Sequence, residues 1–454
     1  MITAGPVLLA ILLAAIGFIV WSTARWRWHP FLALIVTAYA IGLAAQMPAL
    51  EVAKTIAAGF GELMTSIGLV IVAGTIIGVM LERSGAAVVM AEAILRLVGP
   101  RRPGLAMSLI GYVVSIPVFC DSGFVILAAL NKALARRTGV SLTALAIALS
   151  TGLYATHTMV PPTPGPLAAA ANLHATNLGL VIVIGLLCAI PPMLAGYLWS
   201  RRFARHFDPG QRFGEEGDPG AEWERMKAQY GRLPPAWAAF APLVTPILLI
   251  ALASVAAFPS APLGTGWVQT ALGFLGTPFT ALLIGLALCF PLVRGRMAEA
   301  RSGWISDALK DAAVILVVTG AGGSLGKMLG ATHISDYLAA ALAQAHLGVF
   351  LPFAIAAAIK TAQGSSTVAM VTTSAILQPM LAALGFDGEF GRTLMVMAVA
   401  AGSMVVSHAN DSYFWVVSQF SHMEVSTAYR AQTTGTLIQG LAGILTVAAL
   451  SILV

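Results

Sequence analysis

Four polar clusters interrupt long apolar stretches of the chain. They are residues 119–123 (FCDSG), 156–166 (THTMVPPTPGP), 360–367 (KTAQGSST) and 407–412 (SHANDS). In lipid, a backbone group freed by such a break must find a partner, or it costs several kcal/mol. We therefore expect the four breaks to be buried in protein or to line a wet cavity.

Each break is followed by a plausible helix start. Ser122 precedes 124–134, Thr163 precedes an Ala-rich run, Ser365 and Ser366 precede 368–377, and Asp411 or Ser412 precedes 413–420. Ser, Thr and Asp are preferred N-cap residues. A helix start exposes unpaired N–H donors and about half a positive charge. Four such starts that converge would form an anion site.

Hydroxyl and amide groups at the breaks would suit a polyhydroxylated anion. The candidate substrate-binding residues are Ser122, Gly123, Thr163, Thr361, Gln363, Gly364, Ser365, Ser366 and Asn410. Lys360 would meet a substrate carboxylate or pair with an Asp. The alternative for Lys360 is that its amine extends to the membrane surface.

Ionisable residues within the breaks are candidates for proton coupling. They are Asp121, His157, His408 and Asp411. Such groups inside apolar segments mark proton relays in transport proteins, and histidine titrates near neutral pH. The alternatives are pure N-capping for the two aspartates and structural hydrogen bonds for the two histidines.

The three cysteines are dispersed and no zinc, Walker A or dinucleotide motif is present, so no metal or cofactor is expected.

The elements that must position these residues are apolar helices. Hydrophobic residues make up 58% of the 454 residues and charged residues 10%, whereas soluble domains carry roughly 25% charged residues. This composition excludes a soluble enzyme, a disordered protein and a nucleic-acid binder, and predicts an all-α polytopic membrane protein. The expected crossings are 3–22, 30–49, 57–81, 178–199, 237–258, 268–292, 305–329 and 433–453.

The chain is expected to consist of two inverted-topology repeats, because the breaks and a Gly-xxx-Gly pattern recur about 250 residues later. The N-terminal half is 1–200, the cytoplasmic linker 201–235, and the C-terminal half 236–454. Each half would contain a broken transmembrane helix and a re-entrant hairpin, at about 103–135 and 348–384. A charged segment at 82–100 would lie at the cytoplasmic interface. Arg25 and Arg27 follow the first apolar run, which places the N-terminus in the periplasm.

At the breaks the sequence resembles the gluconate permease family, part of the wider ion-transporter superfamily. The matching stretches are 119–127, 154–166, 360–370 and 407–415, and the likeness extends along essentially the whole chain. The resemblance implies proton-coupled uptake of gluconate or a related sugar acid across the bacterial inner membrane. It also implies a homodimer with elevator-like motion. In the sodium-coupled branch of this superfamily, the tips of the two re-entrant hairpins read Ser-Asn-Thr. Here the tips read Asp121-Ser122-Gly123 and Gly364-Ser365-Ser366 instead.

Three alternatives to a sugar-acid symporter remain open at this point. Relatives in the same family carry D-serine or glycerate, and Asp121 or Asp411 would accept the ammonium group of an amino acid. An intramembrane hydrolase that uses Ser and His is a remote alternative, since no Gly-x-Ser-x-Gly motif is present. A channel is the third, and saturable, gradient-driven accumulation would argue against it.

Overall fold

The structure is a computed structural model that describes residues 5–452 except 100, 203, 208–218, 257–265, 294, 333–347 and 383. The described residues are helical and contain no strand. The helices of the first part are α1 (Gly5–Ala24), α2 (Pro30–Ala44), α3 (Ala49–Arg83), α4 (Ala86–Val98), α5 (Pro103–Val114), α6 (Cys120–Thr138), α7 (Leu142–Met159), α8 (Pro164–Asn172), α9 (Leu178–Arg202), η1 (Ala204–Phe207) and α10 (Pro219–Gln229).

The second part continues the helical bundle. Its helices are α11 (Ala236–Ala256), α12 (Trp267–Leu275), α13 (Pro278–Cys289), η2 (Phe290–Val293), α14 (Met297–Glu299), η3 (Ala300–Trp304), α15 (Ile305–Ala331), α17 (Phe350–Gln363), α18 (Ser366–Leu377), η4 (Gln378–Met380), α19 (Glu389–Ser403), α20 (Ser412–Phe420), α21 (Val425–Ala428), η5 (Tyr429–Thr433) and α22 (Thr434–Ser451).

Long apolar helices dominate the described residues. Five of them, starting at Ala49, Leu178, Ala236, Met297 and Val425, have the length and composition to cross a membrane. The segment of the expected crossing at 268–292 is bent, because α12 and α13 meet at an angle of 70°. Thr277 precedes Pro278 at the start of α13, and the residue before a proline is disfavoured in helical conformation.

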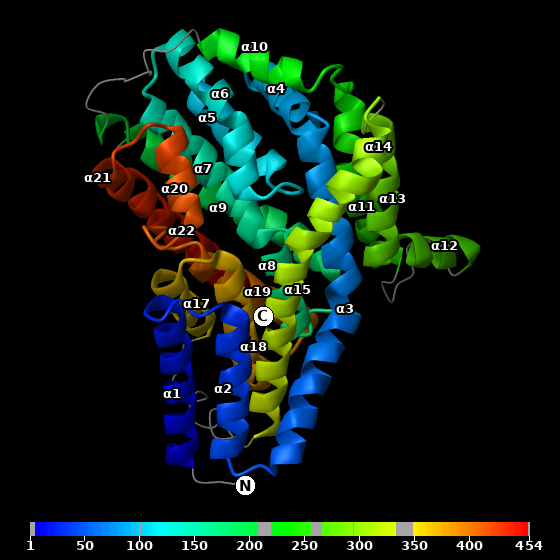
Figure 1. The fold of residues 1–454 in the computed structure, drawn as a ribbon, viewed down its shortest axis with the longest axis vertical. Helices are drawn as coiled ribbons and strands as arrows, with labels where there is room; N and C mark the ends of the chain where they lie inside the picture. The colour runs from blue at the N-terminus through cyan, green and yellow to red at the C-terminus, as the bar shows by residue number, and fades with distance from the viewer. Residues whose placement is uncertain are drawn as a thin grey trace.

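The two longest apolar segments, α3 and α15, pack along each other through the middle of the molecule (Figure 1). Glycines allow this close approach: a Cβ added at Gly59 would lie 2.6 Å from Gly323 O, and one at Gly323 would lie 2.7 Å from Gly59 O. The Gly-xxx-Gly glycines pack on other segments: a Cβ at Gly322 would lie 2.3 Å from Val371, and one at Gly326 would lie 3.2 Å from Ala375 O. They fix the backbones against which the interrupted helices lie.

Two pairs of short helices lie toward opposite ends of the molecule (Figure 1). The first helix pair, α5 and α6, lies toward the end that carries α4 and α10. The second helix pair, α17 and α18, lies in the half that contains α1 and α2. Proline starts α5 at Pro103, and Gly139, with φ 68°, follows the end of α6. Proline at the first position and glycine beyond the last are the favoured boundaries of a helix.

Two further helices occupy the segments expected to be charged. Within 82–100 the structure places the end of α3 and then α4, which packs against α5 and α11. In the linker, α10 covers α6, and its Trp223 is buried. Ion pairs of 3.7 Å from Lys132 to Glu222 and 2.8 Å from Lys227 to Glu92 hold it there. Linker residues 208–218 lie outside the described part of the chain.

Candidate functional site

The tip of the second helix pair rests on the break between α19 and α20. Gly364, which ends α17, has φ 92°, a backbone conformation that favours glycine. A Cβ at this position would lie 2.1 Å from Asn410 O, so a larger residue would clash with backbone. Glycine here lets the tip approach the break and brings Lys360 within reach of Asp411.

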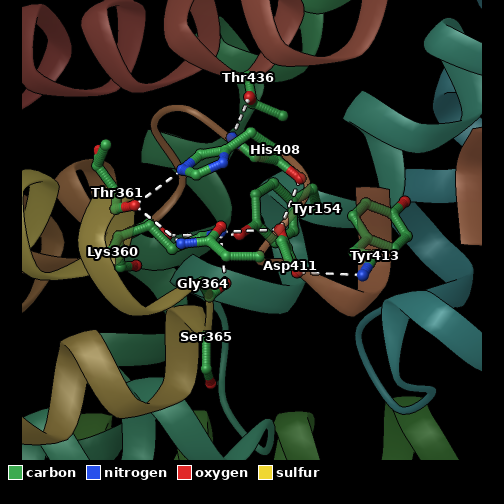
Figure 2. Close-up of polar contacts among 12 residues, drawn as sticks. Tyr154, Lys360, Thr361, Gly364, Ser365, His408, Asp411, Tyr413 and Thr436 are labelled. Carbon is green, nitrogen blue, oxygen red and sulfur yellow. Dashed lines mark hydrogen bonds and ion pairs between the residues drawn. The ribbon is translucent and has the colours of Figure 1, made fainter. Parts of the chain in front are cut away.

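Lys360 and Asp411 form a buried ion pair (Figure 2). The Lys360 side chain is fully buried, and its Nζ lies 2.8 Å from Asp411 Oδ2 and donates to Gly364 O at 2.6 Å. Ser407 Oγ donates to the same Asp411 oxygen at 2.6 Å. A buried charge is tolerated where it is paired and hydrogen-bonded. The structure therefore pairs Lys360 with an aspartate, which was one of its expected roles.

Asp411 has a second role at the start of α20. Its Oδ1 accepts a hydrogen bond from Tyr413 N at 3.1 Å, so the predicted N-cap is confirmed at Asp411. The strand-like segment before it is held from α22, where Thr436 Oγ1 accepts from Ser407 N at 3.0 Å. Thr433 Oγ1 donates to Ser407 O at 2.6 Å. These hydroxyls satisfy backbone groups that the break frees.

The first helix pair presents Asp121 at its tip. Here the capping prediction is wrong: α6 starts at Cys120 with Phe119 in the N-cap position, so Ser122 lies inside the first turn. Asp121 Oδ1 is buried without a hydrogen-bond partner among the described residues. Asp121 lies within electrostatic range of both Asp411 and Lys360. Its position at a helix start favours the negative charge.

The two predicted histidines have different surroundings. His157, at the end of α7, is 7% exposed, and its Nδ1 has no partner within the described part of the chain. Its ring lies 6.5 Å from Tyr154 and 6.1 Å from Phe119. His408 is half-buried, and its Nε2 donates to Thr361 O at 2.8 Å (Figure 2).

The breaks of the two halves adjoin one another. A Cβ at Gly165 in α8 would lie 2.8 Å from Met370 Sδ in α18. On α3, one at Gly74 would lie 3.3 Å from Pro162, and one at Gly78 would lie 2.5 Å from Pro117 O. The start of α8 therefore lies beside α18, and α3 supports both the break after α7 and the turn of the first helix pair.

Most of the other predicted site groups bond within the protein. Ser365 Oγ accepts from Val368 N at 3.3 Å, which confirms this N-cap. Thr163 occupies the N-cap position of α8, but its hydroxyl donates to Val160 O at 2.6 Å. Gln363 donates to Ser365 O at 2.5 Å, and Asn410 donates to Thr361 O at 2.9 Å.

The remaining hydroxyls contact residues that the sequence interpretation missed. Ser122 lies near Glu82 of α3, and Ser366 lies near Tyr154. Tyr154 also lies 5.2 Å from the Tyr413 ring. Glu82 had been assigned to an interfacial segment, and nothing in its local sequence indicated a role at the site. Tyr154 immediately precedes the break at 156–166, and that position was the available signal. No cluster of three metal-ligating side chains occurs in the described residues.

The chain is similar to known transport proteins over nearly its whole length. The profile of the GntP family permease matches residues 7–453. The chain is 33% identical to a gluconate permease of Pseudomonas aeruginosa, over 98% of this chain and 97% of the relative. It is 30% identical to the D-serine transporter DsdX of Escherichia coli, over 94% of both. The solved structure of Neisseria gonorrhoeae MtrF shares the fold, with a TM-score of 0.67, 15% identity and coverage of 95% and 96%.

Long apolar helices interrupted by polar segments form the all-helical fold of a polytopic membrane protein. The chain belongs to the GntP permease family. This confirms the resemblance drawn from the four breaks. Because the family consists of permeases, the intramembrane hydrolase is excluded as a reading of the Ser and His residues.

Proposed function

We propose that the protein imports gluconate or a related sugar acid together with protons across the bacterial inner membrane. The observation that carries the proposal is the buried Lys360–Asp411 pair, with Asp121 within electrostatic range of it. This cluster offers one lysine, two carboxylates and the starts of α6, α18 and α20. A cation and helix N-termini attract a carboxylate substrate.

The architecture supports two halves of opposite orientation, 1–200 and 236–454, joined by the linker 201–235. The first and second helix pairs lie toward opposite ends of the molecule, as re-entrant hairpins of inverted repeats would (Figure 1). The N-terminal helices α1 and α2 lie at the end opposite α10. With the basic linker in the cytoplasm, the N-terminus is periplasmic.

Proton coupling follows from the charge of the buried cluster. One lysine and two ionised carboxylates carry a net charge of about −1, and a sugar-acid anion would make it about −2, at high desolvation cost. A proton that enters with the substrate removes this excess. Asp121 is the favoured acceptor, because Asp411 is held by Lys360, Ser407 and Tyr413. His157 and His408 would relay the proton.

Substrate contacts would form at the hydroxyl groups around this cluster. Ser122, Gly123, Ser365 and Ser366 lie at the two tips, and Thr163 lies at the start of α8. The second tip is shaped by two hydrogen bonds, from Asn410 to Thr361 O and from Gln363 to Ser365 O, and by the close approach of Gly364 to Asn410. Lys360 would share its charge between Asp411 and the incoming carboxylate.

Uptake of labelled gluconate into proteoliposomes tests the proposal. We expect accumulation when the pH outside is lower than the pH inside, and its collapse when an ionophore removes the gradient. Asp121→Asn should still bind gluconate but should lose the response to the gradient. Val125→Ala, on the exposed side of α6, is the matched control. Uptake that ignores the proton gradient would contradict the coupling.

A second candidate function is the transport of a small hydroxy- or amino acid such as glycerate or D-serine. Asp121 Oδ1, which has no hydrogen-bond partner among the residues that the structure describes, favours it, because an ammonium group needs an acceptor. Competition of labelled gluconate by D-serine and by glycerate separates the candidates. A homodimer, implied by the resemblance alone, is tested by the mass of the purified protein in detergent.

A further inference from the structure

A large cavity lies far from the four breaks, at the end of α9. Its volume is about 1080 Å³, and it is bounded by the starts of α5 and α7 and the end of α9. Its basic lining residues are Arg101, Arg102, Arg201 and His206. Nothing in the proposed transport cycle uses these residues.

The side-chain charge around this cavity is positive, whereas the ends of α6 and α9 add partial negative charge there. The described lining residues include no Asp or Glu. The ion pairs of the described part of the chain leave Arg101, Arg102 and Arg201 out. Three exposed arginines around one hollow produce a local positive potential. The hollow is therefore expected to attract an anion.

Two helix starts open into the same cavity. Pro103 begins α5, and Ser141 caps α7 by accepting from Ala144 N at 3.3 Å. Both helix N-termini add partial positive charge to that of the arginines. Guanidinium groups bind phosphate oxygens in a bidentate manner, so phosphate is the anion that best fits this donor set.

One wall of the cavity is apolar. It consists of Leu105, Val140, Ala144, Leu145 and the Tyr197 ring. The cavity also lies where the membrane-length helix α9 ends, at Arg201 and Arg202. Tyrosine is enriched at such membrane boundaries. An apolar wall below a basic rim suits a lipid, whereas a free phosphate would leave the wall uncovered.

We propose that this cavity binds the headgroup of an anionic phospholipid, with its phosphate at the arginines and its upper acyl chain on the apolar wall. Basic pockets between transmembrane helices bind acidic headgroups in this manner. The bound lipid would brace α5 and α7 against α9. The site is separate from the substrate site, so its test does not depend on which substrate is transported.

Thermal unfolding of the full chain in detergent tests the proposal. Added phosphatidylglycerol should raise the midpoint by several degrees, whereas phosphatidylcholine and inorganic phosphate should not. Arg102→Gln should weaken phosphatidylglycerol binding about fivefold, because each basic residue near an anionic lipid surface contributes about 1 kcal/mol to binding. Arg225→Gln on α10, an exposed charge outside the cavity, should leave binding unchanged.

Two substitutions at Ser141 keep the helix cap and change only the charge. Ser141→Asp should abolish the shift by repelling the phosphate, and Ser141→Asn should retain it, because Asp, Asn and Ser cap equally well. An equal shift in both variants, or with phosphatidylcholine, would overturn the proposal. A shift produced by inorganic phosphate alone would overturn the lipid assignment.

Discussion

At the tip of the second helix pair the buried charges are matched, whereas at the tip of the first an aspartate oxygen has no partner. Lys360 lies 2.8 Å from Asp411, and Asp411 also accepts from Ser407 and Tyr413. Asp121 Oδ1 is buried without a hydrogen bond in the described residues. The second tip is therefore organised before a substrate arrives, and the first retains the capacity to accept a proton or a cation.

The largest effect is expected from breaking the matched pair. Lys360→Met should destabilise the protein by about 3–5 kcal/mol, because it leaves a buried carboxylate uncompensated. It should also abolish transport. Thermal unfolding in detergent and an uptake assay measure the two effects. The double variant Lys360→Met with Asp411→Asn should regain much of the stability, and a single variant as stable as the double would contradict the role of the pair.

Asp121→Asn should affect function and leave stability nearly unchanged. Asp121 Oδ1 has no hydrogen bond to lose among the described residues, and the change removes a negative charge within electrostatic range of Asp411. We expect an unfolding midpoint equal to or above that of the native protein and no proton uptake with substrate. A loss of stability comparable to that of Lys360→Met would show that the two tips do not differ.

The two tips should also differ at their serines. Ser365→Ala removes an N-cap hydrogen bond from α18 and should cost about 1 kcal/mol. Ser365→Asn is the control and should cost almost nothing, since Asn is an equally good cap. Ser122→Ala should cost less than Ser365→Ala, because Ser122 lies inside the first turn of α6. Chemical denaturation of the three variants ranks them.

The smallest effect is expected at α10, which covers α6 of the first helix pair. Glu92→Gln removes the partner of Lys227 and should cost about 0.2–1 kcal/mol, less at high salt. The hydrogen bond to Glu92 raises the pKa of Lys227. The pair therefore stabilises fully below the unfolded lysine pKa of about 10.4 and weakens only above it. If Glu92→Gln lost the same stability at all salt concentrations, the loss would come from packing and not from the ion pair.

Sequence reasoning located the chemistry by local rules. The caps at Ser365 and Asp411 follow from residue type next to an apolar run. The same rule was wrong at Ser122, because α6 begins two residues earlier, at Cys120. The bend between α12 and α13 was missed even though Pro278 marks it. Continuous apolarity hides a bend, since hydropathy does not depend on backbone direction.

The sequence by itself determined that the protein is a helical membrane protein and that four polar breaks, each followed by a helix start, interrupt its apolar segments. Those properties are local: they depend on transfer free energy and on hydrogen bonds within a few residues. Only the tertiary structure decided that Lys360 meets Asp411, 51 positions away, and that Asp121 Oδ1 has no hydrogen-bond partner in the described part of the chain. Which groups share a buried space depends on how the helices pack. Glycines such as Gly59 and Gly364 determine how closely the packed segments approach each other.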